Sequence, residues 1–316
     1  MARILKEQFM KDLQTGGILA SLLEFVKNDD TLDFQIRDNE VHIYYRGGRL
    51  LGIKPSKSMY NFKFDMNYLK TLPPSSKTTA VTLQSLATTY QWDEYFPLCK
   101  QAMDIFFTHN KKHEREYQQL VVRENNYSAI SNSTDFFILD IEYDNKDGAR
   151  FDLIALEWES NSTKRRLLKG YKPRLVIIEM KYGDGALVGE SGIVAHVKDF
   201  NSFISSVVKV TDFKKEMLAL FAQKRELGLI KFSKSGNPNQ VTEFEDRIEL
   251  AFIFANHDPG SIKLKRELKK VEEEKIKFFT ANFMGYGLYK KCLYNYTDFT
   301  EKFEQQIYET KNPPRD

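Results

Sequence analysis

Short runs of alternating apolar and polar residues occupy the first third of the chain. The runs are LDFQIRD, EVHIYYR, RLLGIK and YNFKFDM. The pairs Asp38–Asn39 and Gly47–Gly48 fall between such runs, where a tight reversal needs residues that tolerate positive φ. The pattern therefore predicts an antiparallel β-meander near the N-terminus.

Between residues 93 and 125 the apolar spacing changes to that of amphipathic helices. Phe96 and Met103 share one stripe, and Asn110 interrupts the pattern, so we predict two consecutive helices. The interruption is also our predicted domain boundary. It separates an N-terminal β-meander plus helix module, residues 1–110, from a second domain with a C-terminal extension, residues 111–316.

The apolar runs after residue 133 predict three strands, a helix, a further strand and a charged helix. The strands are expected at 136–143, 150–157, 174–181 and 248–255, a hairpin turn at 145–148, and the helices at 192–208 and 261–275. With the preceding helix, the order is helix, strand, strand, strand, helix, strand. This order predicts an α+β fold, with an α/β core in which helices flank a mixed central β-sheet.

Composition narrows the class of protein. The chain has 316 residues with 24 Phe and 16 Tyr, which indicates a packed globular structure. Its net charge of +3 does not by itself indicate a polyanionic partner. Cys99 and Cys292 lie too far apart for a zinc ribbon or a disulfide framework. No apolar run approaches the roughly 18 residues that cross a bilayer, and charges interrupt the N-terminal stretch. We expect a soluble, cytoplasmic protein without a membrane partner.

Two acids interrupt strands that otherwise read as buried. Glu179 and Lys181 share one face at the end of the strand LVIIEMK, and Asp152 lies inside the strand RFDLIALE. Buried charges are costly unless they are paired or bind a metal ion. A divalent cation together with a phosphate would explain two acids and one lysine, and a structural buried ion cluster is the alternative.

These residues and the order of elements resemble the PD-(D/E)xK nuclease superfamily, which has the restriction-endonuclease-like fold. Phe151–Asp152 and Glu179–Met180–Lys181 match the motif, with Phe151 in place of the proline, and the resemblance covers residues 112–256. It implies that Asp152, Glu179 and the Met180 carbonyl hold Mg²⁺ (or Mn²⁺). It also implies that Lys181 positions or activates the attacking water.

The resemblance implies a further acid from the preceding helix and a polar residue on the following one. Among Glu114, Glu116 and Glu124 we choose Glu116, because it lies beside an apolar helix face. On the following helix, His196 is the candidate for contacting phosphate or positioning water, with Asp199 to orient it. A structural histidine is the equally weighted alternative.

Other charged residues around the motif are open to two interpretations. Asp140 and Glu142 alternate onto one face of their strand, where we expect solvated edge charges rather than an outer carboxylate shell. A basic stretch precedes the Glu179 strand and is expected to track a phosphate backbone near the site. Its candidate substrate-binding residues are Lys164, Arg165, Arg166 and Arg174.

The sequence thus predicts a metal-binding hydrolase, a Mg²⁺-dependent nuclease that cleaves DNA phosphodiester bonds. The N-terminal module would bind substrate or a protein partner. The alternatives are a catalytically inactive member of the same fold that binds nucleic acid or scaffolds a complex, and a nuclease directed at RNA.

Overall fold

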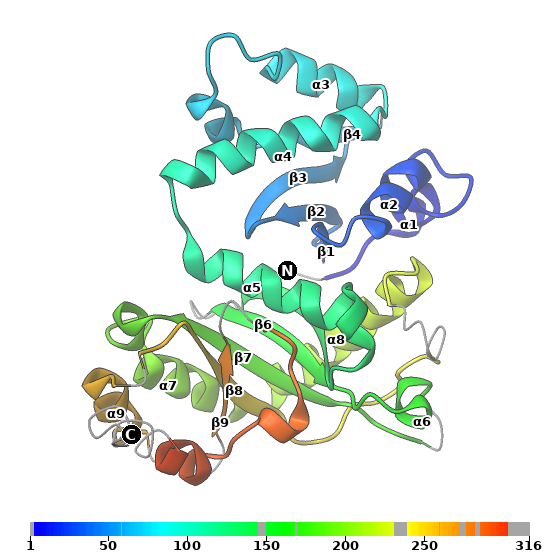
Figure 1. The fold of residues 1–316 in the computed structure, drawn as a ribbon. Helices are drawn as coiled ribbons and strands as arrows, with labels where there is room; N and C mark the ends of the chain where they lie inside the picture. Colours follow the sequence, from blue (N-terminus) through cyan, green and yellow to red (C-terminus); the bar gives the residue numbers. More distant parts are fainter. Residues whose placement is uncertain are drawn as a thin grey trace. The chain divides into compact units, whose positions relative to one another are not determined.

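The computed structural model describes residues 3–57, 59–144, 150–167, 170–230, 239–258, 260–271, 276–281 and 285–302. Two compact units make up the chain (Figure 1). Unit 1 comprises Met1–Arg123 and Glu216–Gln240, and unit 2 comprises Glu124–Lys215 and Val241–Asp316. The units divide inside helices α5 (His113–Asn126) and α8 (Val207–Glu226), whereas the sequence analysis placed one boundary at residue 110.

Unit 1 contains the predicted β-meander, an antiparallel sheet of order β1-β2-β3-β4. The strands are β1 (Asp33–Arg37), β2 (Glu40–Tyr45), β3 (Gly48–Pro55) and β4 (Tyr60–Lys63). Asn39 in the first turn has φ +50°, as expected for a reversal. The second turn is centred on Arg46–Gly47, one residue before the predicted pair, and both residues have positive φ. Gly47 is also required sterically, since a Cβ there would lie 2.4 Å from the Arg115 backbone.

Helices cover this sheet. The two predicted helices are present as α4 (Trp92–His109) and α5, and in Figure 1 α4 runs between the sheet and the short helix α3 (Ala80–Thr88). Helices α1 (Glu7–Leu13) and α2 (Ala20–Lys27), like α3, were not predicted. A 3₁₀ helix, η1 (Met66–Thr71), links β4 to α3 and packs against α4.

The second half of α8 belongs to unit 1 through specific polar contacts. Lys224 is 2% exposed, and its Nζ donates to Gln35 Oε1 at 3.0 Å. Gln35 Nε2 in turn donates to Asp33 Oδ2 at 2.8 Å, and the Arg3 backbone N–H donates to Glu216 Oε1 at 2.8 Å. The bonds to α8 join residues about two hundred positions apart, which explains why unit 1 is not a continuous segment.

Unit 2 contains a five-stranded mixed sheet of order β5-β6-β7-β8-β9, so the predicted fold class is confirmed. The strands β5, β6 and β7 pair antiparallel, and β7, β8 and β9 pair parallel. They are β5 (Phe136–Asp144), β6 (Arg150–Glu157), β7 (Arg174–Tyr182), β8 (Glu249–Ala255) and β9 (Ile276–Ala281). The first four match the prediction closely, and β9 was not predicted. The predicted turn at 145–148 lies outside the described residues.

The helices of unit 2 are shorter and more numerous than predicted. One helix was expected at 192–208, but the structure has two in this region. Helix α7 (Ile193–Ile204) ends at Ile204, and α8 begins at Val207. The charged helix expected at 261–275 is α9 (Ile262–Leu268). The remaining short helices are η2 (Ala129–Asn132), α6 (Ser162–Arg165), η3 (Asp184–Leu187) and η4 (Lys290–Cys292), and residues 296–302 are also helical.

Aromatic side chains fill the contacts between this sheet and its helices. Phe203 of α7 meets Phe151 of β6 edge to face, with ring centroids 5.3 Å apart. At the other end of the sheet, Phe299 stacks on Phe278 of β9 with a centroid distance of 4.8 Å. The strands that carry the motif are therefore held in a packed aromatic core.

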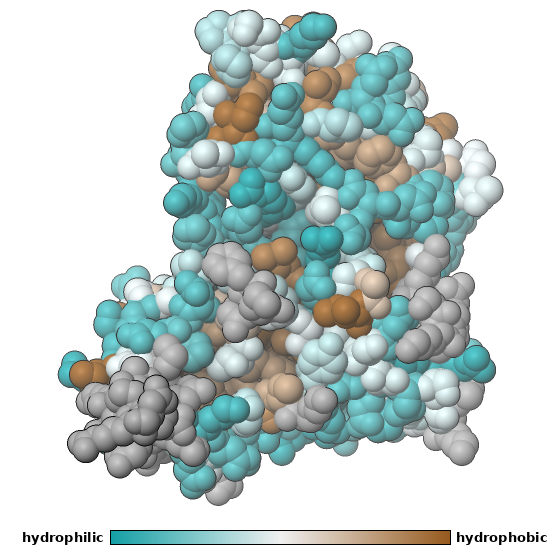
Figure 2. Space-filling model, viewed as in Figure 1, coloured by the Kyte–Doolittle hydropathy of each residue, from teal (hydrophilic) through white to brown (hydrophobic). Residues whose placement is uncertain are grey.

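The surface has a different composition. On the face shown in Figure 2, hydrophilic residues predominate on each unit and apolar residues form small separate patches. Within the described residues, no helix combines the length and the apolar character that crossing a bilayer demands.

Candidate functional site

Asp152 and Glu179 are brought together by the pairing of β6 with β7. The register pairs Leu153 with Ile178, so the next positions along the two strands, Asp152 and Glu179, face each other. The Met180 backbone N–H donates to Asp152 Oδ2 at 2.9 Å. Lys181 follows two positions after Glu179 and therefore lies on the same face of β7.

Burial makes this cluster unusual. The side chain of Glu179 is 0% exposed and that of Lys181 is 3% exposed, with Lys181 Nζ 4.0 Å from Glu179 Oε2. Among the residues that the structure describes, neither carboxylate oxygen of Glu179 has a hydrogen-bond partner. Buried polar groups are nearly always satisfied in folded proteins, so two unsatisfied oxygens on one carboxylate call for a ligand or a proton.

Electrostatics point in the same direction. Burial raises the pKa of Glu179 well above its usual range, and the neighbouring Asp152 charge raises it further. Burial also raises the pKa of Asp152, against the opposing effects of the Lys181 charge and the Met180 N–H. Two desolvated carboxyl groups of like charge resist ionising together, and a nearby cation relieves that resistance.

His196 joins the cluster from the first turns of α7. Its Nδ1 lies 3.1 Å from Glu179 Oε2, without hydrogen-bond geometry. Burial, followed by the Lys181 charge, lowers the pKa of His196 to about 4. The imidazole is therefore neutral at pH 7 and can act as a hydrogen-bond partner but not as a cation. Its neighbours are Glu179, Lys181 and the Ser191 backbone, and Asp199 does not orient it as we had expected.

The cluster fits a magnesium ion with two carboxylate ligands and one backbone ligand. The N–H and C=O groups of one strand residue face the same neighbouring strand, so the Met180 carbonyl is expected to face β6 and Asp152. Mg²⁺ commonly uses one or two carboxylates and retains several waters. Across the described ranges, no group of three or more His, Cys, Asp or Glu side chains is arranged to hold a metal ion, so an ion here would have two carboxylates, Asp152 and Glu179, and the Met180 carbonyl as its protein ligands.

Glu116, the acid chosen from the preceding helix, is held by partners within unit 1. Glu116 belongs to unit 1, where its Oε1 accepts from Arg46 Nε at 2.7 Å. Arg46 also pairs with Asp104 at 2.8 Å. The carboxylate of Glu116 therefore stabilises the β2–β3 turn, a role that its helix position alone did not reveal.

The first two basic candidates have structural partners. Lys164 pairs with Glu159 at 2.5 Å. Arg165 is 3% exposed and donates to the Thr134 carbonyl, and burial lowers the pKa of its guanidinium to about 10. A buried guanidinium that bonds to the backbone is not available to a phosphate, which corrects the prediction for Arg165.

Arg174 is engaged in the same way. Its guanidinium lies 3.3 Å from carboxylate oxygens of Glu157 and Glu249, and 2.6 Å from Glu245. Arg166 is exposed. Lys164, Arg165 and Arg174, which were expected to track a phosphate backbone, are therefore engaged by groups of the protein itself.

The prediction that Asp140 is a solvated edge charge is wrong. Asp140 is 0% exposed, although it was expected to be a solvated edge charge. A β-bulge between Ile138 and Asp140 pairs Asp140 with Ile154, and Ile154 shares a face with Asp152. The sequence held a usable signal, since Asp140 lies between Leu139 and Ile141 just as Asp152 lies between apolar residues.

Comparison of the chain with protein-family models, with curated proteins and with solved structures found no match.

Proposed function

We propose that unit 2 is a metal-dependent phosphodiesterase that hydrolyses DNA with Mg²⁺ or Mn²⁺. The observation that carries the proposal is the fully buried Glu179 carboxyl group, which lies against the Asp152 carboxyl group and whose oxygens have no partner of good hydrogen-bond geometry among the described residues. A structural ion cluster would be expected to satisfy these oxygens. A cation-binding site leaves them unsatisfied until the ion is bound.

The residues divide the chemistry between them. Asp152, Glu179 and the Met180 carbonyl would hold the metal ion, which when bound makes a water easier to deprotonate and neutralises phosphate charge. Lys181 places an ammonium 4.0 Å from Glu179, where it would stabilise the extra negative charge of the transition state. The neutral His196 would hold a water or a phosphate oxygen by a hydrogen bond.

The reducing environment of the cytoplasm suits this enzyme. Cys99 is buried and Cys292 is exposed, and both are free thiols. An exposed free cysteine is tolerated best where thiols stay reduced. We therefore expect the reaction to occur in the cytoplasm.

Cleavage of plasmid and linear DNA by the full chain tests the proposal. We expect nicking or degradation with Mg²⁺ or Mn²⁺ and its loss in EDTA. Asp152→Asn, Glu179→Gln and Lys181→Met should each lower the rate by about 100-fold or more, because each removes a metal ligand or a charge that stabilises the transition state.

Matched controls come from exposed residues in and just before α7. Lys198→Met repeats the Lys181 substitution and Glu190→Gln repeats the Glu179 substitution, both at exposed positions. Both controls should cleave at the wild-type rate. Absence of metal-dependent cleavage of DNA by well-folded wild-type protein would refute the proposal, and cleavage of RNA alone would redirect it to the other nucleic acid.

A further inference from the structure

One face of the antiparallel sheet in unit 1 is polar and rich in cations. Side chains alternate along a strand, so the pairing of β1 to β4 assigns each residue to a face. One row across the four strands consists of Gln35, His42, Gly52 and Lys63. The adjacent row consists of Arg37, Glu40, Lys54 and Asn61. We call these two rows, together with Arg49, the cationic face.

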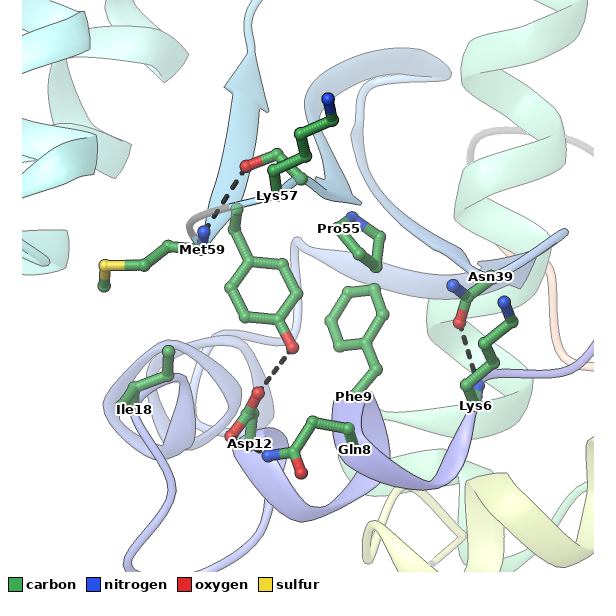
Figure 3. Close-up of a pocket in the computed structure, with 11 residues that line it drawn as sticks. Lys6, Gln8, Phe9, Asp12, Ile18, Asn39, Pro55, Lys57 and Met59 are labelled. Atoms are coloured by element: carbon green, nitrogen blue, oxygen red, sulfur yellow. Dashed lines mark hydrogen bonds between the residues drawn. The ribbon is translucent and has the colours of Figure 1, made fainter.

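The opposite face of the sheet is apolar and covered by helices. Phe9 of α1 packs on Tyr60 of β4 with ring centroids 4.7 Å apart, and Figure 3 shows Phe9 beside Pro55 of β3. Helix α4 comes equally close, since a Cβ on Gly48 would lie 2.9 Å from the Phe107 ring. The cationic face is therefore the face on which this sheet can meet a ligand.

The cationic face is open on the side of β3 and β4. At the β1 end, Lys224 of α8 donates to Gln35 and covers the sheet. Towards β4 the exposed fraction of the side chain is 15% for His42 and 66% for Lys54, and Lys63 is exposed. A ligand can therefore approach β3 and β4.

Arg49 is held in place on this face by its neighbours. Gly52 has no side chain, and a Cβ there would lie 3.8 Å from Arg49 Cδ and Nε, so the Arg49 side chain extends over Gly52. Arg49 Nη1 lies 3.5 Å from His42 Nε2. A guanidinium that is already placed loses less conformational entropy when it binds a ligand.

The acid in the middle of this face, Glu40, is already engaged. Its Oε1 accepts from Lys54 Nζ at 2.6 Å, and its Oε2 lies 3.4 Å from His42 Nε2. Within the described residues, neither Arg49 nor Lys63 has a carboxylate partner. Two cations of the open side are therefore left for an external anion.

The charges gathered around His42 act on its protonation. Burial, followed by the Arg49 and Arg37 charges, lowers the pKa of His42 to about 4. The imidazole is therefore neutral at pH 7, with positive charge on both sides. Like charges gathered on one surface repel each other, and a bound anion relieves that repulsion. The cationic face is thus suited to an anionic ligand.

We propose that the cationic face of unit 1 binds the phosphate backbone of double-stranded DNA, with Arg49 and Lys63 as contacts to phosphate oxygens. The identity of the polyanion rests on the proposed function. Neighbouring rows of side chains on one face of a sheet lie about 7 Å apart along the strands, so the cations can meet several phosphates in series.

The same face favours a duplex over a single strand. Proteins that bind single strands usually stack the bases on aromatic side chains. Tyr44, which pairs with Arg49 and follows His42 by two residues, is 6% exposed and offers no such platform. Contacts to phosphates position DNA without reading its sequence. We therefore expect duplexes of different sequence to bind alike.

Fluorescence anisotropy of a labelled duplex of about 20 base pairs, with the full chain in EDTA, tests the inference. Arg49→Gln and Lys63→Gln should each weaken binding by about five- to tenfold. Each should also lower the slope of log K against log salt concentration by about one, because one phosphate contact is lost. Lys77→Gln, at an exposed position before α3, is the matched control and should change affinity by less than about twofold.

A second pair of variants tests the position of Arg49. Gly52→Asp places a carboxylate beside the Arg49 guanidinium, whereas Gly52→Asn adds the same shape without the charge. Gly52→Asp should bind the duplex at least about fivefold more weakly than Gly52→Asn, because its charge neutralises Arg49 and repels phosphate. This pair and Lys63→Gln decide the question even if circular dichroism shows that Arg49→Gln does not fold.

The outcomes separate this inference from the proposed function. Absence of duplex binding, or equal effects of Lys63→Gln and Lys77→Gln, overturns the inference while metal-dependent cleavage can stand. Calorimetric binding of inorganic phosphate to the wild type but not to Arg49→Gln, without duplex binding, would assign the face to a free phosphate and overturn the assignment to DNA. Duplex binding that depends on Arg49, in a protein that does not cleave DNA, supports the inference and refutes the proposed function.

Discussion

Replacement of Glu179 by glutamine should stabilise the protein in the absence of metal. Glu179 is 0% exposed, its oxygens lack hydrogen-bond partners within the described residues, and burial raises its pKa well above the usual range. Glutamine has nearly the same shape and carries no charge. Glu179→Gln therefore removes the cost of a buried carboxylate and keeps the packing around it.

The size of the effect can be bounded. An unfolded glutamate has a pKa of about 4.3, and each unit of pKa corresponds to about 1.4 kcal/mol. At pH 7 burial of this group destabilises the folded protein by at most the free energy of protonating it, which is about 3.7 kcal/mol, because the group can take up a proton instead of staying charged. The amide must itself be accommodated in the same unsatisfied environment, so we expect a net gain of about 1–3 kcal/mol.

Urea unfolding followed by tryptophan fluorescence measures this gain. Trp92 lies in unit 1 and Trp158 lies in unit 2, and both are buried. In a Trp92→Phe background, fluorescence reports the unfolding of unit 2 alone, with and without the Glu179→Gln substitution. In EDTA at pH 7 the Glu179→Gln variant should unfold at a higher urea concentration, with an unchanged slope.

The pH and metal dependences follow from the same property. Because the pKa of Glu179 is higher in the folded than in the unfolded state, the folded state binds more protons above a pH of about 4.3, and stability decreases as pH rises. Glu179→Gln should show a smaller decrease, which the raised pKa of Asp152 still contributes. Mg²⁺ at about 100 times its Kd should add about 2.7 kcal/mol to the wild type and nothing to the variant.

Glu190→Gln is the matched control, and the exposed position should change stability by less than about 0.5 kcal/mol. The reasoning would be refuted if Glu179→Gln destabilised unit 2 in EDTA. That result would mean that the charged carboxylate gains more from Lys181 and His196 than it loses by burial, as in a structural ion cluster.

Three further predictions concern other parts of the chain. Arg165→Ala should cost at least about 2 kcal/mol of unfolding free energy, because a buried guanidinium and its carbonyl bond are lost, and should leave DNA affinity unchanged in fluorescence anisotropy. The pKa of His42 is lowered to about 4 by burial and then by the Arg49 charge. The contribution of His42 to stability should thus be complete above a pH of about 6.5 and fall by about 3 kcal/mol towards pH 4, a loss absent from His42→Gln in acid titrations followed by circular dichroism. Phe278→Ala should cost about 3–5 kcal/mol in urea unfolding, since its fully buried ring stacks with its aromatic neighbours, and a cost below about 1 kcal/mol would contradict this packing.

The elements around the motif could be predicted because their signals are local. The strand RFDLIALE forms β6 with its predicted bounds, and LVIIEMK forms all of β7 except its first and last residues. An apolar run that is covered on both faces fixes a strand through neighbours only a few residues away. The acids Asp152 and Glu179 stood out for the same reason, since each interrupts such a run.

Helix boundaries depended on less visible signals. The break between α7 and α8 falls at Ser205–Ser206, without a glycine or proline to mark it. Asp140 was misjudged because a bulge shifts its pairing, and a bulge follows from how two strands meet. Neither feature is a property of one short segment of sequence.

By itself, therefore, the sequence determined most of the secondary elements, their α+β class and the two buried acids with their lysine. The tertiary structure decided which charges are neutralised: Arg174 meets Glu249 and Arg46 meets Glu116 across long stretches of chain. It also decided that the second half of α8 completes unit 1 through Lys224 and Gln35. Periodicity reflects neighbours along the chain, whereas ion pairs and buried polar contacts reflect neighbours in space, which only folding brings together.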